Sequence, residues 1–162
     1  MTTPTDNPWA TALGRIPSGL FVVTARGPDG QETGLLASWV QQCSFDPPQV
    51  SVAVRKSRYL LDWLADGAAL GVSVIPEGGK VLVKHFAHGF GPDEPAFADL
   101  PVIRLPGSAP LLADAHAILD CRVVGRADLG GDHVLVVGQV VNGRVLHDAK
   151  PTTHVRKSGL HY

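Results

Sequence analysis

A segment with an alternating apolar pattern in the first third of the chain ends in side chains that bind anions. Residues 49–54 read QVSVAV, and Arg55, Lys56 and Ser57 follow directly. The alternation predicts a half-buried strand that carries two cations and a hydroxyl at its end. A helix is predicted over residues 57–65 with Ser57 as its cap, and its free N–H groups would favour a phosphate. The alternative is an ordinary serine cap with solvated cations.

Small side chains precede this strand, in the segment GLLASWVQQCSFDPP at residues 34–48. Gly34, Ala37 and Ser38 stand beside Trp39, and small residues allow a ligand to approach the backbone closely. The two segments together suit a flat ring joined to an anionic tail.

Histidines are the other candidates for chemistry, and the chain has seven. His85 and His88 can share one helix face, but no third ligand is evident, so no metal site is predicted. His133 follows Gly131 and Asp132 and opens a long apolar segment, which places its imidazole at a strand start, where it can bind a ligand edge. The alternative is that Asp132 bonds to the turn backbone and His133 is merely exposed. No hydrolase, Walker-type or Rossmann motif appears.

The two cysteines, Cys43 and Cys121, lie in or beside apolar segments without the spacing of a zinc site or a disulfide scaffold. Both are therefore expected to be reduced core residues. The alternative is that Cys43 touches a ligand through its backbone.

Size and composition favour one β-rich domain. The 162 residues are 44% hydrophobic and 18% charged, and 18 Gly and 13 Pro imply many turns between short strands. A net charge of -1 with scattered cations argues against nucleic acid or an anionic membrane as a partner. Neither an apolar run of ~20 residues nor a signal peptide is present, which predicts a cytoplasmic protein.

The order of elements indicates an antiparallel barrel, because six or seven strands follow one another with few long helices between them. Beyond the segments above, strands are predicted at residues 20–25, 70–75, 102–105, 117–124 and 133–141, and helices at 9–13 and 80–86. Residues 88–98 read as a lid or an interface arm that Phe97 pins down. The tail, residues 152–162, is basic but ends in an aromatic, and either packs back on this chain or a second subunit, or is disordered.

Five of these segments together resemble the flavin reductase-like, FMN-binding split-barrel family, from about residue 13 to the end. They are residues 34–48, the strand end RKSRY at 55–59, KHF at 84–86, LDCRV at 119–123 and GDH at 131–133. The version with Ala-Ser-Trp-Val looks closest to modules of rubredoxin reductases and diflavin proteins. The resemblance implies a homodimer of six-stranded antiparallel Greek-key split β-barrels with short peripheral helices and one FMN near the interface. It makes residues 1–12 an N-terminal arm and 13–162 the domain.

The resemblance also assigns site residues. Ala37, Ser38, Trp39 and Val40 would line the ribityl chain and ring, with Cys43, Ser44 and Phe45 adding backbone and hydroxyl contacts. Ser44 would bind the phosphate, and Lys56 or Arg58 would supply its counter-charge. Lys84, His85, Phe86 and Ala87 would border the flavin, and His133 would face the nicotinamide.

The function that the resemblance implies is hydride transfer from NAD(P)H to flavin, for which positioning matters more than acid–base chemistry. The alternative is an FMN electron-transfer module that exchanges electrons with a redox protein, because Trp39 is bulky for a site where nicotinamide stacks. Another flat ligand, such as haem or F420, is a lesser possibility. The sequence leaves open NADH against NADPH, and a monooxygenase, a metal chelate or a redox protein as the acceptor.

Overall fold

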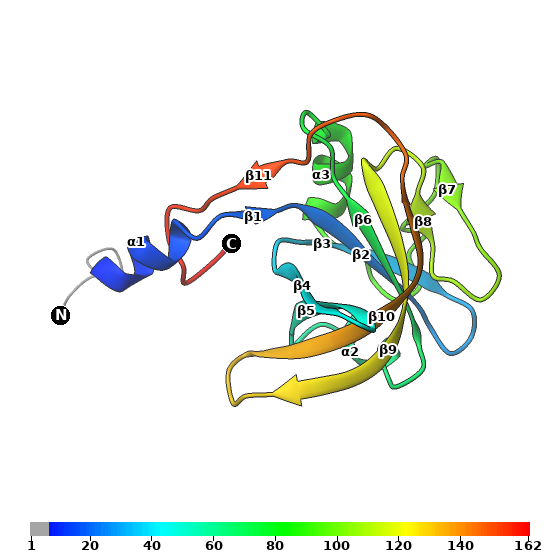
Figure 1. Cartoon of the computed structure of the whole chain (residues 1–162), viewed down its shortest axis with the longest axis horizontal. Helices are drawn as coiled ribbons and strands as arrows, with labels where there is room; N and C mark the ends of the chain where they lie inside the picture. Colours follow the sequence, from blue (N-terminus) through cyan, green and yellow to red (C-terminus); the bar gives the residue numbers. More distant parts are fainter. Residues whose placement is uncertain (1–6) are drawn as a thin grey trace.

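The computed structural model describes residues 7–162, which form a rolled antiparallel sheet with short helices outside it and an arm that extends from it (Figure 1). The helices are α1 (Pro8–Gly14), α2 (Leu60–Trp63) and α3 (Lys80–Ala87). The strands are β1 (Ser18–Gly19), β2 (Phe21–Arg26), β3 (Glu32–Ala37), β4 (Val40–Phe45), β5 (Pro48–Arg55), β6 (Ala69–Val74), β7 (Val102–Ile103), β8 (Leu111–Leu112), β9 (Ala117–Asp128), β10 (His133–Val145) and β11 (Thr153–His154). None of the helices within residues 7–162 has the length and apolar character needed to cross a membrane.

Seven strands form the main sheet, in the order β3-β2-β6-β9-β10-β5-β4, each antiparallel to its neighbours. The edges are β3 and β4, yet only Ser38 and Trp39 separate these strands in the chain. A flat sheet would hold its edges roughly 29 Å apart at ~4.8 Å per strand, which two residues cannot span. The sheet therefore rolls until its edges meet, and the predicted antiparallel barrel with peripheral helices is confirmed.

The number of strands differs from the six that the resemblance implies. The bend at Ser38 and Trp39 divides residues 32–45 into β3 and β4, which gives seven strands in the sheet. The predicted strand at 102–105 is shorter, since β7 holds only two residues and pairs with β8, which the sequence pattern did not reveal.

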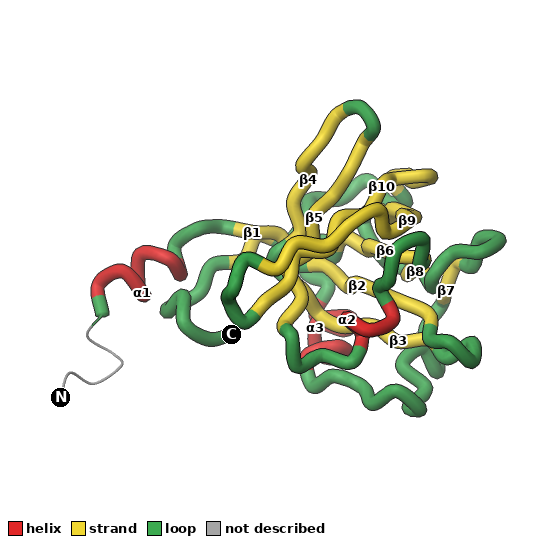
Figure 2. The backbone as a smooth tube through the Cα atoms, turned by 90° about the horizontal axis from the view of Figure 1, so that it is seen from below, coloured by secondary structure: helices red, strands yellow, loops and turns green. Residues whose placement is uncertain are grey.

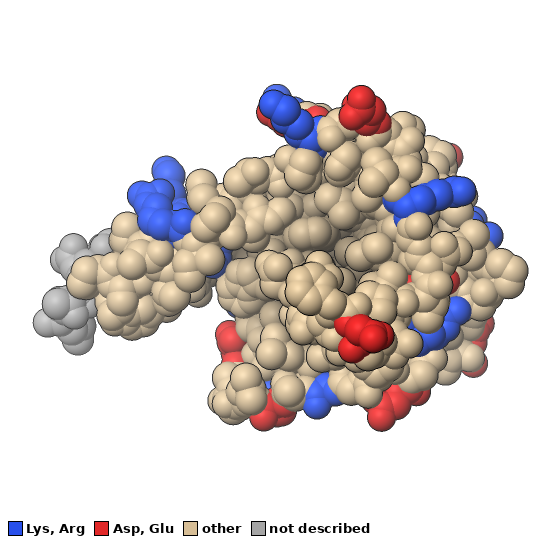
Figure 3. All heavy atoms as spheres, in the orientation of Figure 1, with Lys and Arg blue, Asp and Glu red and all other residues tan. Residues whose placement is uncertain are grey.

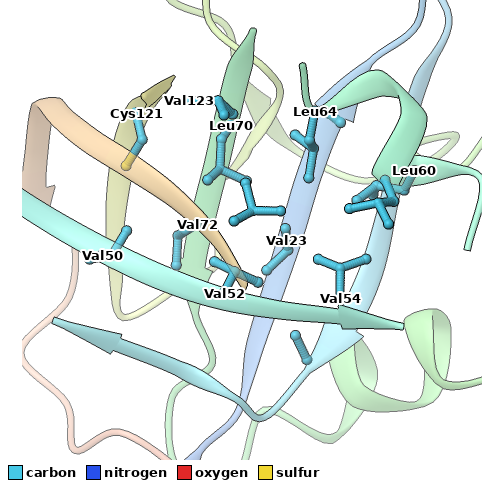
Figure 4. Packing of buried hydrophobic residues seen from close by; sticks show 14 of the residues in the cluster. Val23, Val50, Val52, Val54, Leu60, Leu64, Leu70, Val72, Cys121 and Val123 are labelled. Atoms are coloured by element: carbon cyan, nitrogen blue, oxygen red, sulfur yellow. The ribbon is translucent and has the colours of Figure 1, made fainter. Parts of the chain in front are cut away.

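The barrel interior is filled by one apolar cluster, to which β5 contributes most regularly. Val50, Val52 and Val54 are buried, as the alternating pattern predicts, and pack against Leu70 and Val72 of β6 (Figure 4). Each fully buried side chain of this size contributes about 1.5–3 kcal/mol relative to exposure. The cluster holds β5, and with it the cations that follow β5, in a fixed position.

A second apolar cluster covers the outside of the sheet beneath α3. Phe86 of α3 is fully buried there, and Phe97 packs on it with ring centroids 5.9 Å apart. Phe97 therefore pins the 88–98 segment as predicted, and Phe90 joins it against Phe86. Because β2 lies between the two clusters, both Val22 and Val23 are fully buried.

The predicted helix at residues 57–65 is wrong in its start. The helix α2 begins at Leu60, has Tyr59 at its cap position without a side-chain capping bond, and spans four residues. Ser57 lies in the turn before it. A helix this short gives little dipole, so the expected phosphate site at a Ser57-capped N-terminus is not formed.

An arm and a hairpin project from the barrel. The arm combines α1, β1 and the tail, since β1 pairs with β11 and the N–H of Gly159 donates to the carbonyl of Ala10 (Figure 1). The tail therefore packs on its own chain, and the disordered alternative is wrong. The β4–β5 hairpin projects separately (Figure 2). Residues 1–6, half of the predicted 1–12 arm, lie outside the described residues.

Burial separates the two cysteines, both of which are free. Cys121 is fully buried, and burial raises the pKa of its thiol to about 12. Cys43 is exposed on β4, so its expected place in the core is wrong: its strand lies at the sheet edge and projects from the barrel.

We expect a thiol reagent such as Ellman's reagent to modify one cysteine per native chain at mildly alkaline pH, because Cys43 is exposed whereas Cys121 is buried and the pKa of its thiol is raised to about 12. The second thiol should react only after unfolding in guanidinium. Cys43→Ser should abolish the native reaction. Equal reaction of both thiols in the folded protein would show that the barrel around Cys121 is open.

Candidate active site

A cavity of about 680 Å³ opens on the concave side of the sheet, between the arm and the β4–β5 hairpin. Figure 3 shows a face that is hollowed near its middle, with most of its charged side chains toward the margin. The apolar part of the wall comes from Phe21, Val50, Val72, Val74, Leu119 and Leu135. Ser18, Ser38, Gln41, Gln42 and Ser51 add polar groups. Small-molecule sites have this size, with apolar walls and few polar groups.

Trp39 and His133 meet beside this cavity, with ring centroids 4.8 Å apart. Trp39 lies between β3 and β4 and is fixed by its carbonyl, which accepts from the N–H of Ala53 at 3.0 Å. His133 is the first residue of β10, and the register of β10 on β5 places it opposite Arg55. Two aromatic side chains far apart in sequence thus face one another where the barrel edges meet.

Asp132 orients the His133 ring. Nδ1 of His133 lies 2.7 Å from Oδ1 of Asp132, and the imidazole is only 13% exposed. The carboxylate accepts, so Nδ1 carries the proton, and this hydrogen bond holds the pKa of Asp132 below its usual value. The expectation that Asp132 serves the turn backbone alone is therefore wrong, because its side chain fixes the imidazole.

The tail returns to this pair of rings. The hydroxyl of Tyr162 lies 2.8 Å from Nε2 of His133, and its ring centroid is 5.8 Å from that of Trp39. The guanidinium of Arg156 lies over Trp39 at 5.0 Å, and that of Arg55 over Tyr162 at 5.4 Å. Burial raises the pKa of the Tyr162 phenol, so this hydroxyl is protonated at neutral pH and can donate to His133.

Three arginines around these rings lack an acidic partner. Within residues 7–162, Arg55, Arg58 and Arg156 form no ion pair, whereas Nζ of Lys56 lies 2.9 Å from Oδ1 of Asp128. Nε of Arg55 is the one buried side-chain nitrogen or oxygen of the described residues without a hydrogen-bond partner. A buried unpaired donor is costly, and an anionic ligand would satisfy it.

The sequence matches the family described as flavin reductase like domain over residues 13–160. This chain belongs to that family. It is 42% identical to the putative diflavin flavoprotein A 6 of Nostoc sp., across 93% of this chain and 26% of that protein. It is 38% identical to diflavin flavoprotein A 1 of Synechocystis sp., across 97% and 27%. The chain thus spans about a quarter of the length of these curated relatives.

Solved structures share the barrel of this flavin reductase-like domain. The NADH:FAD oxidoreductase SgcE6 of Streptomyces globisporus superimposes with a TM-score of 0.82 at 26% identity, over 96% of this chain and 92% of that one. The flavin reductase PheA2 superimposes with a TM-score of 0.74 at 25% identity, over 90% of each chain. The resemblance inferred from the sequence, and the fold that it implied, are confirmed.

Of the residues expected around the ring of a flavin, some line the cavity and one lies in the barrel core. Ser38, Trp39 and Val40 line the cavity, as a ring-contacting segment should. Ala37 is buried in the apolar cluster of the barrel and does not line the cavity. The roles of these residues in flavin binding stay predictions.

Ser44 and Lys56 cannot share a phosphate within one chain. Ser44 pairs with Gln49 near the tip of the β4–β5 hairpin, and Lys56 follows the opposite end of β5. The seven residue steps from Gln49 to Lys56 span about 23 Å in extended strand. Phe45, beside Ser44, is 91% exposed at the tip. The single phosphate site expected from these residues is therefore wrong for one protomer.

Arg58 does meet the segment that follows α3. A Cβ added to Gly89 would lie 3.5 Å from Nη1 of Arg58, so the guanidinium lies against the end of this helix. On α3 itself, Lys84 and Ala87 are exposed, whereas the side chain of Phe86 is buried and turned away from any ligand.

His85 already has a partner, since its Nε2 lies 2.7 Å from the carbonyl oxygen of Ala96. Its expected place beside the flavin stays a prediction. Throughout residues 7–162, His, Cys, Asp and Glu side chains form no group of three placed to hold a metal ion.

The residues at this site are suited to a flavin. An apolar cavity lined by Trp39 suits a flat ring. The unpaired Nε of Arg55, which lies over the ring of Tyr162, suits an anionic group. Sequence reasoning noted Arg55 at the strand end but did not place it in the site, and missed Arg156 and Tyr162 altogether. The only signal for these two was the unusual aromatic end of a basic tail.

Proposed function

We propose that this domain binds FMN and acts as a flavin reductase that uses NADH or NADPH. The observation that carries the proposal is the apolar cavity that Trp39 lines. Arg55, whose Nε is unsatisfied, lies over the ring of Tyr162, which in turn contacts Trp39. Membership of the flavin reductase-like domain family supports it, as does the likeness to an NADH:FAD oxidoreductase. A bound flavin supplies the two-electron chemistry, accepting hydride from the reduced nicotinamide.

The protein contributes position and the exclusion of water. Ser38, Trp39 and Val40 form one wall for the ring, and the valines and leucines of β5, β6, β9 and β10 keep the other side dry. Arg58, at the end of α3, is the cation we assign to the phosphate, because Lys56 is already paired with Asp128. Holding two reactants in contact in a dry site accounts for a large part of such a rate enhancement.

His133 is placed to orient the donor. Its Nδ1 proton is held by Asp132, which leaves Nε2 directed at the space that Tyr162 occupies. A ligand amide or phosphate in that space would hydrogen-bond to Nε2.

An electron-transfer module is the second candidate, and it is favoured by the side chains that cover the ring of Trp39. Tyr162 and Arg156 both lie against that ring, where a nicotinamide would stack. In this reading FMN stays bound and exchanges electrons with a redox protein. The diflavin flavoproteins similar to this chain are about four times its length.

We further propose a homodimer, with a monooxygenase or redox protein as the physiological partner. Large apolar side chains are exposed on the projecting parts: Trp9, Ile16 and Val155 on the arm and Phe45 on the hairpin. Such patches are typical of interfaces. They flank the cavity, so a second chain seated there would help to enclose it. The domain limits and the cytoplasmic location stay predictions.

Anaerobic titration tests the first candidate against the second. We expect the purified protein to bind FMN. Addition of NADH or NADPH should then bleach the visible absorbance of the bound flavin. FAD and riboflavin serve as comparison ligands. Retention of FMN without bleaching by either nicotinamide, but with bleaching by a reduced rubredoxin, would support the electron-transfer module and reject the reductase. A chromophore of another type, such as haem or F420, would reject both.

A further inference from the structure

Tyr162 rests on the surface of the barrel instead of inside it. Its ring contacts Trp39, its hydroxyl reaches His133, and Arg55 lies against its face, yet 66% of the residue is exposed. A core residue loses a large apolar area when it leaves its place, whereas a ring this exposed gives up little. Tyr162 can therefore be replaced by a competing ring at small cost.

The segment that carries Tyr162 also forms part of the cavity. Arg156 and Gly159 line its wall. The segment is held at one end by two backbone bonds, from the N–H of Arg156 to the carbonyl of Gly14 and from the N–H of Gly159 to that of Ala10. Beyond Gly159, the contacts with Trp39, His133 and Arg55 are the ones that hold Tyr162.

The surroundings of Tyr162 suit an aromatic ligand that carries negative charge better than they suit a phenol. Arg55, Arg58 and Arg156 stand close enough for their charges to act on its hydroxyl, and none of them forms an ion pair within residues 7–162. A neutral phenol leaves these charges unpaired. A ring joined to phosphates would stack on Trp39 and pair with Arg55 and Arg156.

We propose that Tyr162 sets the affinity of this domain for its nicotinamide donor: it occupies a site on Trp39 and His133 that an aromatic ring of the dinucleotide takes, and the donor binds by displacing it. The inference rests on the proposed reductase function. When a ligand must displace a side chain of the protein, its apparent affinity is its intrinsic affinity multiplied by the fraction of protein in which the site is free. Stacking and cation–π contacts of this kind favour the state with Tyr162 on Trp39 over the state with Tyr162 displaced by roughly 10:1.

Fluorine NMR follows Tyr162 directly, because the chain has two tyrosines. Tyr59 is the internal reference, since its hydroxyl is bonded between Thr33 and the carbonyl of Phe90. With 3-fluorotyrosine incorporated and FMN present, we expect NAD⁺ to move the Tyr162 resonance to the position of a solvent-exposed tyrosine and to leave the Tyr59 resonance in place. A Tyr162 resonance that does not respond to saturating NAD⁺ overturns the proposal.

Variants connect that displacement to donor affinity. Tyr162→Ala should lower the Kd for NAD⁺ and the KM for the reduced nicotinamide about tenfold, and Tyr162→Phe by less, because only the bond to His133 is lost. Leu160→Ala is the matched control, from the same segment but outside these contacts. An unchanged KM in Tyr162→Ala, with flavin reduction otherwise normal, overturns the role of Tyr162 alone.

The proposed reductase function fails separately. If neither the native protein nor Tyr162→Ala is reduced by NADH or NADPH, the reductase proposal and this inference fall together. If only Tyr162→Ala is reduced, the inference is supported in its strongest form.

Discussion

Arg58→Ala is expected to weaken FMN binding about 10- to 100-fold, while riboflavin binding changes by about twofold or less. The reason is that riboflavin has the ring and the ribityl chain but lacks the phosphate. A hydrogen bond to a charged group contributes about 1.5–3 kcal/mol, which corresponds to this range of affinity. Arg58 has its guanidinium against the end of α3 and no acidic partner among the described residues, so its charge is available to a ligand.

Lys56→Ala tests which of two cations binds the FMN phosphate, because the sequence allowed either Lys56 or Arg58. Its ammonium is bonded to Asp128, and that bond holds the pKa of the carboxyl below its usual value, so the pair persists at neutral pH. A lysine already paired in this way has less to offer a phosphate, and a smaller loss of FMN affinity is expected than for Arg58→Ala.

Arg26→Ala, at an exposed position at the end of β2, controls for net charge. Titration of FMN and riboflavin by calorimetry measures all three variants. A larger effect at Lys56 than at Arg58, or an equal loss of FMN and riboflavin, would contradict the assignment of the phosphate to Arg58.

Regular strands were predictable because burial leaves a repeating mark on the sequence. The alternation of residues 49–54 predicted β5, and its valines are buried while the residues between them are partly exposed. The run LFVVTA at residues 20–25 likewise predicted a strand, and β2 is covered on both faces. In both cases packing on the sheet determines the residue types, so the pattern can be read without the structure.

Elements that bury little were not predictable in the same way. β4 carries Gln41, Gln42 and Cys43 as three exposed residues in succession, so no alternation marks it as a strand. It forms because the turn at Asp46 and Pro47 folds it back on β5, whose valines are buried in the barrel. The helix α2 is another case, since Leu60 and Leu61 are buried by the barrel while the residues before them turn without helical bonds.

Two contacts of the candidate site depend on how distant strands pair. The sequence indicated Trp39 and His133 as separate candidates, but their contact requires β10 to pair with β5 so that His133 lies opposite Arg55. The return of Tyr162 requires β11 to pair with β1, two strands of two residues each. Neither pairing leaves a local signal, because strand partners are chosen by the whole sheet. Residue types therefore predicted the chemistry of the site but not its assembly.

Gly71→Ala is expected to destabilise the fold by about 2–4 kcal/mol, a large effect for the addition of one methyl group. Gly71 lies in the middle of β6, opposite Thr24 of β2. A Cβ at this position would overlap Oγ1 of Thr24 and would lie 3.0 Å from the carbonyl oxygen of Pro110. That hydroxyl is fully buried and donates to Pro110, so it cannot turn away without leaving the carbonyl unsatisfied.

A double-mutant cycle identifies the cause. Thr24→Ala alone should cost about 1–2 kcal/mol through the lost hydrogen bond, and it also removes the atom that a Cβ at Gly71 would meet. The double variant should therefore be more stable than the sum of the two losses predicts, by at least ~1 kcal/mol. Urea unfolding measures each free energy. Gly125→Ala is the control, because a Cβ there meets nothing within 4 Å in the same sheet. A cost at Gly71 as small as that at Gly125 would mean that β2 and β6 are not packed against the Pro110 loop as described.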